Sequence, residues 1–242
     1  MTALPITGRE IIADDAGALA RAAADWIVHT LNALGGNLRV ALSGGSTPKE
    51  LYRLLGSGPH RDRMPWQRLE LFWGDERFVP YDSPQSNYAM VQQTLLASKP
   101  IAPERVHPVP VDGTPVQSAH RYEAELKTIY GTDRLDPARP LFDVILLGLG
   151  ADGHTCSLLP GQPVLEDRTH WVAAVLAGRD EPRITLTYPS VEASRTIAFL
   201  VAGADKAAAV KTVRAGSSDL PAARIRASGE VIWFLDRAAA QG

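Results

Sequence analysis

Short apolar runs alternate with amphipathic stretches along most of the chain. The apolar runs have the length of strands, and they cover residues 38–42, 69–73, 142–147, 171–176, 184–188, 196–201 and 231–235. Strands that are buried on both faces of a parallel sheet have this continuous apolar pattern, and helices usually connect them. The pattern therefore predicts an α/β protein whose mostly parallel sheet has helices on both faces.

Helical patterns fill the segments between these strands. Helices are predicted from residue 16 to about 34, from 47 onward, and over 87–96, 116–130 and 205–214. Asp15 and Ser86 are suited to cap the first and third of them. The proline-rich segment 99–115 is expected to be a surface excursion, since it is too short to link separate domains. We therefore predict a single domain over residues 1–242.

Charge and composition exclude several classes of partner. The 242 residues include 25 basic and 27 acidic ones, for a net charge of −2, and no basic stripe indicates a nucleic-acid partner. No segment approaches membrane-spanning length, and the first ten residues lack the basic head and apolar run of a signal peptide. The single cysteine, Cys156, rules out an internal disulfide. A soluble cytoplasmic protein, without nucleic-acid or membrane partners, is the expectation.

The turn after the apolar run 142–147 holds the most informative polar residues. Gly148, Gly150 and Gly153 have the G-x-G-x-x-G spacing of dinucleotide-binding proteins, but no long helix is predicted after them. Two other interpretations are a glycine-rich turn that merely ends the strand and a turn whose polar residues take part in function. Because ligands bind beyond the carboxyl ends of parallel strands, we favour Asp152 and His154 as working residues. The adjacent Cys156 is better explained as a packed side chain than as a nucleophile.

A second glycine-containing turn follows the run 38–42. It comprises Ser43, Gly44, Gly45, Ser46 and Thr47, and the predicted helix begins within it. Its amides and hydroxyls suit a phosphate, although an ordinary turn with helix-capping residues explains the pattern equally well. The turn lacks the lysine of a nucleotide-binding P-loop. Cations for an anionic ligand would then come from Arg183 and Lys206, each of which taken alone is more typical of a solvated surface.

Charged residues also follow the run 69–73. Asp75, Glu76 and Arg77 are suited either to proton handling and substrate contact or to a solvated, mutually neutralising cluster. Asn87 is a helix-start residue by default, and a binder of hydroxyl groups if this turn faces the pocket. The remaining histidines have no comparable setting and are interpreted as surface or structural residues.

Five of these segments together resemble the 6-phosphogluconolactonase family. They are 43–48, 74–80, 86–87, 148–161 and 182–185, in order along nearly the whole chain. The resemblance implies a Rossmann-like, three-layer αβα fold, which glucosamine-6-phosphate deaminases and isomerases share. It further implies hydrolysis of 6-phospho-D-glucono-1,5-lactone to 6-phosphogluconate, the second step of the oxidative pentose phosphate pathway, without a cofactor or a metal.

The resemblance also implies roles for individual residues. His154 matches the catalytic histidine and would act as general base, because a neutral imidazole is available near neutral pH. Asp152 or Asp75 would orient it, and Arg77 would hold substrate hydroxyls or stabilise negative charge. The phosphate would lie against residues 43–47, Arg183 and Lys206, with Asn87 also contacting substrate. A monomer or weak homodimer is expected.

Two other functions fit parts of the pattern. The related deaminases carry a glutamate five positions after the histidine, where this chain has Leu159. A sugar-phosphate sensor would use the same pocket without turnover, but the fifteen or so residues before the first helix are too few for a DNA-binding module. Both alternatives are therefore weaker than lactone hydrolysis.

Overall fold

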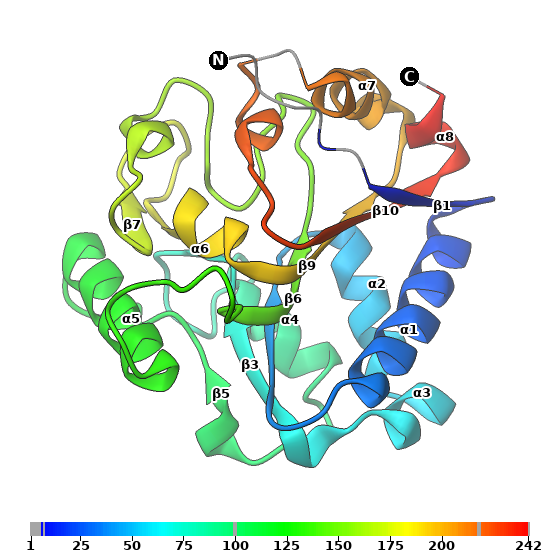
Figure 1. Ribbon diagram of the computed structural model, residues 1–242, viewed down its shortest axis with the longest axis horizontal. Coiled ribbons are helices and arrows are strands. Elements are labelled where there is room, and N and C mark those ends of the chain that lie inside the picture. The colour runs from blue at the N-terminus through cyan, green and yellow to red at the C-terminus, as the bar shows by residue number, and fades with distance from the viewer. Residues whose placement is uncertain (1–5, 7, 99–100, 217–218, 242) are drawn as a thin grey trace.

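The computed structural model describes residues 6, 8–98, 101–216 and 219–241 (Figure 1). Within them, seven strands form one sheet in the order β1-β10-β9-β6-β2-β3-β5, and every neighbouring pair is parallel. The strands are β1 (Arg9–Ala13), β2 (Leu38–Leu42), β3 (Leu69–Trp73), β5 (Val106–His107), β6 (Phe142–Leu147), β9 (Ser194–Val201) and β10 (Glu230–Asp236). The predicted parallel sheet is confirmed.

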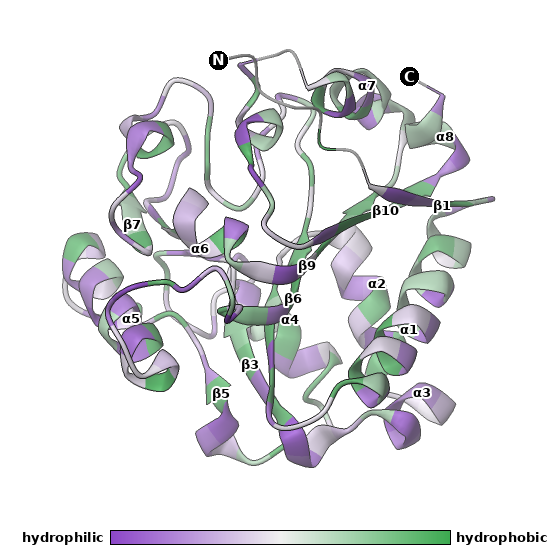
Figure 2. Ribbon diagram, in the orientation of Figure 1, coloured by the Kyte–Doolittle hydropathy of each residue, from purple (hydrophilic) through white to green (hydrophobic). Residues whose placement is uncertain are grey.

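Helices cover both faces of this sheet. They are α1 (Ala16–Ala33), α2 (Ser46–Leu55), α3 (Gly58–Arg63), α4 (Asn87–Thr94), α5 (Pro115–Tyr130), α6 (Tyr188–Glu192), α7 (Ala207–Ala215) and α8 (Arg237–Ala240). In Figure 1, α1 and α2 lie on one side of the central strands and α5 lies on the other. Figure 2 shows hydrophobic colouring along the inner strands and both colours on the outer helices. The predicted three-layer αβα, Rossmann-like fold is confirmed.

The chain reverses its direction of winding between β2 and β6. From β2 it proceeds to β3 on one side, and from β6 it proceeds to β9 on the other side. The two connections that leave these neighbouring strands therefore diverge, and a crevice opens between them at the carboxyl ends of the strands. The two glycine turns singled out in the sequence follow these two strands.

A second, three-stranded antiparallel sheet was not predicted. It consists of β4 (Asp75–Arg77), β8 (Arg183–Leu186) and β7 (Val172–Val175), in that order. Residues 74–77, interpreted as a turn, are therefore partly strand, and the run 184–188 ends at Leu186, since Tyr188 begins α6. The sequence predicted the two later strands but not their separation from the parallel sheet. An apolar run indicates that a strand is buried, but it does not indicate in which sheet the strand lies. Strands β7 and β8 are largely buried in the small sheet.

Several boundaries also differ from the predictions. The segment 99–115 contains β5, which adds an edge strand to the main sheet; its first two residues, 99 and 100, lie outside the described part. Strand β1 and helix α3 were missed because both are short and mostly exposed. The helix expected over 205–214 begins with a 3₁₀ turn, Ala204–Lys206, before α7. The α4 helix ends at Thr94, two residues earlier than expected.

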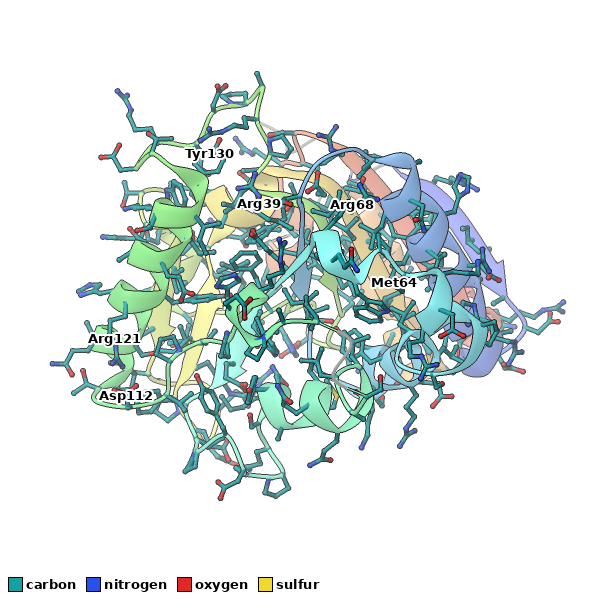
Figure 3. The ribbon with its side chains drawn as sticks, turned by 90° about the horizontal axis from the view of Figure 1, so that it is seen from below. Arg39, Met64, Arg68, Asp112, Arg121 and Tyr130 are labelled. Atoms are coloured by element: carbon teal, nitrogen blue, oxygen red, sulfur yellow. The ribbon has the colours of Figure 1, made fainter. Side chains whose placement is uncertain are left out.

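At the amino ends of the parallel strands, an arginine caps the C-terminal end of helix α1. Figure 3 shows the molecule from this end, with Arg39 of β2 and Arg68, which directly precedes β3, both labelled. The Arg68 guanidinium donates to the carbonyl oxygens of Leu31 at 3.1 Å and Leu34 at 2.7 Å. A cation at a helix C-terminus satisfies carbonyls that have no partner within the helix and interacts favourably with the helix dipole.

We expect Arg68→Ala to lower the free energy of unfolding by about 1–2 kcal/mol, since charge-assisted hydrogen bonds to the end of α1 are lost. Urea denaturation measures the change. Arg53→Ala is the matched control, because Arg53 makes only an exposed ion pair with Glu50 and its loss is expected to cost about 0.5 kcal/mol or less. Equal losses in the two variants would contradict the capping role.

Candidate active site

One pocket lies at the crevice between β2 and β6 and brings together nearly all of the candidate residues. Its volume is about 280 Å³. The candidates that line it are Ser43, Gly44, Gly45, Ser46, Thr47, Asp75, Arg77, Asn87, His154, Arg183 and Lys206. Asp152 and Glu76 lie outside this lining, and Asp152 contacts His154 instead. Residues far apart in the chain therefore meet at one site.

The turn 43–47 presents the amino end of a helix to the pocket. Helix α2 begins at Ser46, so its first backbone amides have no partner within the helix and point toward the pocket. Gly44 packs directly against Asn87, since a Cβ atom at position 44 would lie 2.1 Å from Asn87 Oδ1. Asn87 begins α4, as the default interpretation predicted, and it also lines the pocket, so the binding of hydroxyl groups stays a prediction. The turn has the geometry of an anion-binding site.

Two buried tyrosines hold the strand ends beneath the site. The Tyr52 hydroxyl accepts a hydrogen bond from Ser43 N and donates one to Ser43 O, both at 2.9 Å. Tyr122 makes the same pair of bonds with the backbone of Trp73, at 2.8 and 3.1 Å. Burial raises the pKa of both phenols far above the ordinary value. Sequence reasoning missed both residues because a tyrosine within a helix resembles ordinary core.

His154 and Asp152 form a close pair behind the glycine turn. The Nδ1 atom of His154 lies 2.5 Å from Asp152 Oδ1, and Asp152 Oδ2 accepts a hydrogen bond of 2.8 Å from Arg179. Burial raises the pKa of Asp152, but the bonds from Arg179 and His154 outweigh it and lower the pKa to about 2. An ionised carboxylate only accepts hydrogen bonds, so the imidazole proton belongs on Nδ1. The Nε2 atom is then free to accept a proton.

Only a glycine at position 150 permits this pair. A Cβ atom there would lie 2.1 Å from His154 Nδ1 and 2.5 Å from Asp152 Oδ1. The turn itself closes through a hydrogen bond of 2.8 Å from Gly150 N to His154 O. No helix follows these glycines before the short 3₁₀ turn Pro163–Glu166, which contradicts the dinucleotide interpretation. The glycines serve the close approach of the His–Asp pair.

Two arginines face each other on the small sheet at the pocket wall. Arg77 of β4 pairs across the strands with Arg183 of β8, and both line the pocket. Within the described residues, the buried Nε atoms of both arginines make no hydrogen bond, and neither does the buried Ser43 Oγ. Burial, followed by the positive charge of Arg77, holds the pKa of Arg183 below its ordinary value. Such a concentration of unused donors favours an anionic ligand.

The carboxylates of the 74–77 segment have different positions. Asp75 lines the pocket and accepts a hydrogen bond of 2.7 Å from Ser157 Oγ. Glu76 points away from it, is 1% exposed, and accepts hydrogen bonds from the backbone amides of Arg77, Asn87 and Tyr88. Burial raises the pKa of Glu76, and those amides lower it in part. Glu76 thus joins β4 to the start of α4.

Cys156 and Lys206 complete the pocket lining. The Cys156 sulfur lies on the pocket floor next to Gly74, and burial raises the pKa of its thiol well above the ordinary value. This finding agrees with a packed cysteine rather than a nucleophile. Lys206 follows β9 and pairs with Asp205 at 2.9 Å. The described residues contain no cluster of three or more His, Cys, Asp or Glu arranged to hold a metal ion.

The fold and the pocket together define a Rossmann-like α/β protein whose pocket combines a helix N-terminus and several cations with a His–Asp pair. A family model for glucosamine-6-phosphate isomerases/6-phosphogluconolactonase matches residues 14–233. The chain belongs to this family. Among the helices of the described residues, none is long and apolar enough to cross a membrane.

Individual relatives are similar over nearly the full length. The chain is 38% identical to a 6-phosphogluconolactonase of Nostoc sp. over 95% of both proteins. It is 37% identical to one from Streptomyces coelicolor over 97% of this chain and 94% of the relative. The solved structure of 6-phosphogluconolactonase from Trypanosoma cruzi has a TM-score of 0.85 at 30% identity and covers 100% of this chain and 99% of that one.

We expect Tyr52→Phe to lower the free energy of unfolding by about 2 kcal/mol or more, because two buried backbone groups of Ser43 lose their partner. Urea denaturation measures the loss. In Tyr81→Phe, the matched control, a half-buried hydroxyl gives up only its bond to Val109 O, at an expected cost of about 1 kcal/mol. A Tyr52→Phe protein as stable as this control would show that the backbone of Ser43 does not need the phenol.

Proposed function

We propose that this protein hydrolyses 6-phospho-D-glucono-1,5-lactone to 6-phosphogluconate, the second step of the oxidative pentose phosphate pathway, with His154 as general base. The observation that carries the proposal is the shared pocket. It combines an imidazole with a free Nε2 atom, a helix N-terminus, and the cations Arg77, Arg183 and Lys206. The full-length similarity to 6-phosphogluconolactonases supports the same substrate.

The His–Asp pair suits the activation of water. The water oxygen forms a bond with C1 of the lactone while its proton moves to His154 Nε2. The tetrahedral intermediate then breaks the bond between C1 and the ring oxygen, which receives the proton. Asp152 stabilises the imidazolium that forms in between and holds the ring in one orientation. Of the two carboxylates considered for this role, its contact with His154 favours Asp152 over Asp75.

The remaining candidates have complementary roles in the proposal. The phosphate lies against residues 43–47, Arg183 and Lys206, because unused amides and cations converge there. Arg77 stabilises the oxyanion or binds substrate hydroxyls. Asn87 and Asp75 contact the sugar, and the hydrogen bond from Asn87 Nδ2 to Asp75 O, at 2.9 Å, fixes the two together.

One residue argues against the deaminase alternative within the same family. Leu159 stands where the related deaminases carry a ring-opening glutamate, and it is buried in the core at 3% exposure. A monomeric glucosamine-6-phosphate deaminase shares the fold, with a TM-score of 0.79 at 22% identity. Without a carboxylate at that position, proton transfer during ring opening lacks a partner.

We further propose that the protein acts in the cytoplasm, as a monomer or weak homodimer and as a single domain over 1–242. Residues of this one chain make up the pocket, so the site does not need a second copy. The pairing of β1 with β10 joins the two ends of the chain in one sheet, which supports one domain. The free thiol of Cys156 suits a reducing compartment.

An assay with freshly prepared 6-phosphogluconolactone, corrected for spontaneous hydrolysis and run in excess chelator, tests the function. His154→Ala is expected to lower turnover about 100- to 10,000-fold, the usual contribution of a general base. Its affinity for 6-phosphogluconate should stay within about twofold, since the phosphate contacts remain. His170→Ala is the control, because it removes a similar histidine–aspartate pair outside the pocket. Full turnover in His154→Ala would refute the general-base role, and wild-type binding without turnover would indicate a sensor.

Arg183→Ala is expected to raise KM about 10- to 100-fold with a smaller effect on kcat. The loss of a charge-assisted contact to phosphate costs about 1.5–3 kcal/mol of binding free energy. Steady-state kinetics measures both constants. Arg195→Ala removes an exposed arginine that pairs with Asp143 outside the pocket, and KM should then stay constant. An unchanged KM in Arg183→Ala would remove this residue from the phosphate site.

A further inference from the structure

Arg179 reaches the His–Asp pair from a different part of the fold. It lies in the loop 176–182 between β7 and β8 of the small sheet, whereas Asp152 follows β6 of the large sheet. Its Nη2 atom donates to Asp152 Oδ2 at 2.8 Å and lies 3.3 Å from His154 Nδ1. Sequence reasoning did not single it out, since an arginine beside Asp180 and Glu181 in a glycine-containing loop resembles a solvated charge.

The two oxygens of Asp152 have separate partners. Oδ1 accepts from the imidazole and, at 3.2 Å, from the backbone amide of His154, while Oδ2 accepts from Arg179. A carboxylate bound at one oxygen only is free to rotate about its Cβ–Cγ bond and exchange its oxygens. Arg179 opposes that rotation, because turning the carboxylate breaks the bond at Oδ2. The direction of the Oδ1 lone pairs toward His154 is fixed as a result.

Because the side chains of Arg179 and Asp152 are partly exposed, their ion pair contributes little to the free energy of folding. The side chains of Arg179 and Asp152 are 35% and 40% exposed, and ion pairs of that kind contribute about 0–1 kcal/mol to folding. Arg179 is also absent from the pocket lining in the described structure. Its ion pair therefore adds little to the stability of the fold, and its nearest link to the pocket lining is His154.

The loop that carries Arg179 is tied to the segment between β4 and α4. Glu181 accepts a hydrogen bond of 2.5 Å from the Gln85 side chain, and the Gln85 carbonyl accepts one of 2.5 Å from Arg77. Within the loop, Arg179 Nη1 donates to Gly178 O at 2.8 Å. These bonds fix the position from which the guanidinium reaches Asp152.

We propose that Arg179 is a positioning residue, which holds the Asp152 carboxylate in one rotation so that His154 keeps its proton on Nδ1 and directs Nε2 at the water. The proposal deepens the proposed function and rests on it. Charged groups face the pair from several elements: Arg179 on the β7–β8 loop, Arg77 and Asp75 on β4, Arg183 on β8 and Lys206 after β9. Arg179 is the one among them with a hydrogen bond to Asp152 in the described residues.

Kinetics of three variants test the proposal. Arg179→Ala is expected to lower kcat about 10- to 100-fold with KM within about twofold, because the base is misoriented and the substrate contacts are intact. Arg179→Lys should recover part of kcat, since an ammonium group still donates to Oδ2. Asp180→Asn, in the same loop, is the control for loop charge and should leave both constants unchanged. A raised KM at constant kcat would overturn the proposal by indicating a substrate contact.

A double-mutant cycle separates positioning from a general effect on the loop. In an Asp152→Ala background the guanidinium has no carboxylate to hold, so Arg179→Ala should change kcat by less than about twofold. An undiminished effect of Arg179→Ala in that background would overturn the proposal.

The tautomer of His154 provides a readout that does not need activity. In protein with ¹⁵N-labelled histidine, the nitrogen shifts of His154, assigned by comparison with His154→Ala, should report the Nδ1–H tautomer for wild type and a mixture for Arg179→Ala. An inactive wild type with this tautomer change would refute the proposed function and keep the positioning role. An active wild type whose kcat and tautomer are unaffected by Arg179→Ala would refute the positioning role alone.

Discussion

The hydrogen bond between Asp152 and His154 is the interaction on which the chemistry proposed for this site depends. An imidazole in water exchanges its proton between two nitrogens, and only one tautomer offers Nε2 as a base. The ionised Asp152 selects that tautomer, and the absence of a Cβ atom at Gly150 provides the room for it. The two residues are only two positions apart, so a single turn after β6 contains both partners of the bond.

The binding side of the pocket depends on a different constraint, the reversal of chain direction between β2 and β6. Since the connections from these strands diverge, a pocket opens above them, and the first residues of α2 line it. The small sheet then closes one wall and places Arg77 beside Arg183. The positive charge of Arg77 acts on Arg183, so an anion bound beside both guanidiniums would relieve the repulsion between them.

The sequence was sufficient for the inner strands of the parallel sheet, from β10 to β3, and for most of the pocket lining. It was insufficient for the edge strands β1 and β5 and for the parts that depend on tertiary contacts. Strands β2 and β3 were predicted at their observed bounds, because continuous apolar runs report burial directly. The small sheet was missed, since residues 75–77 are charged and their partners in β8 lie 106 to 110 positions further along the chain. Arg179 and Tyr52 were missed for the same reason: their partners, Asp152 and the backbone of Ser43, follow from the tertiary structure.

Two parts of the site differ in rigidity: the turn 43–47 has buried supports, whereas the β7–β8 loop is exposed. Tyr52 and Tyr122 hold the ends of β2 and β3 through fully buried hydrogen bonds. The turn 43–47 is therefore preorganised before a ligand binds. The β7–β8 loop is largely exposed and is held by a few polar contacts. Movement of this loop would alter the orientation of the base while leaving the anion site intact. Under the proposed function, affinity and turnover therefore depend on separate sets of interactions, and substitutions at the two sets should affect different kinetic constants.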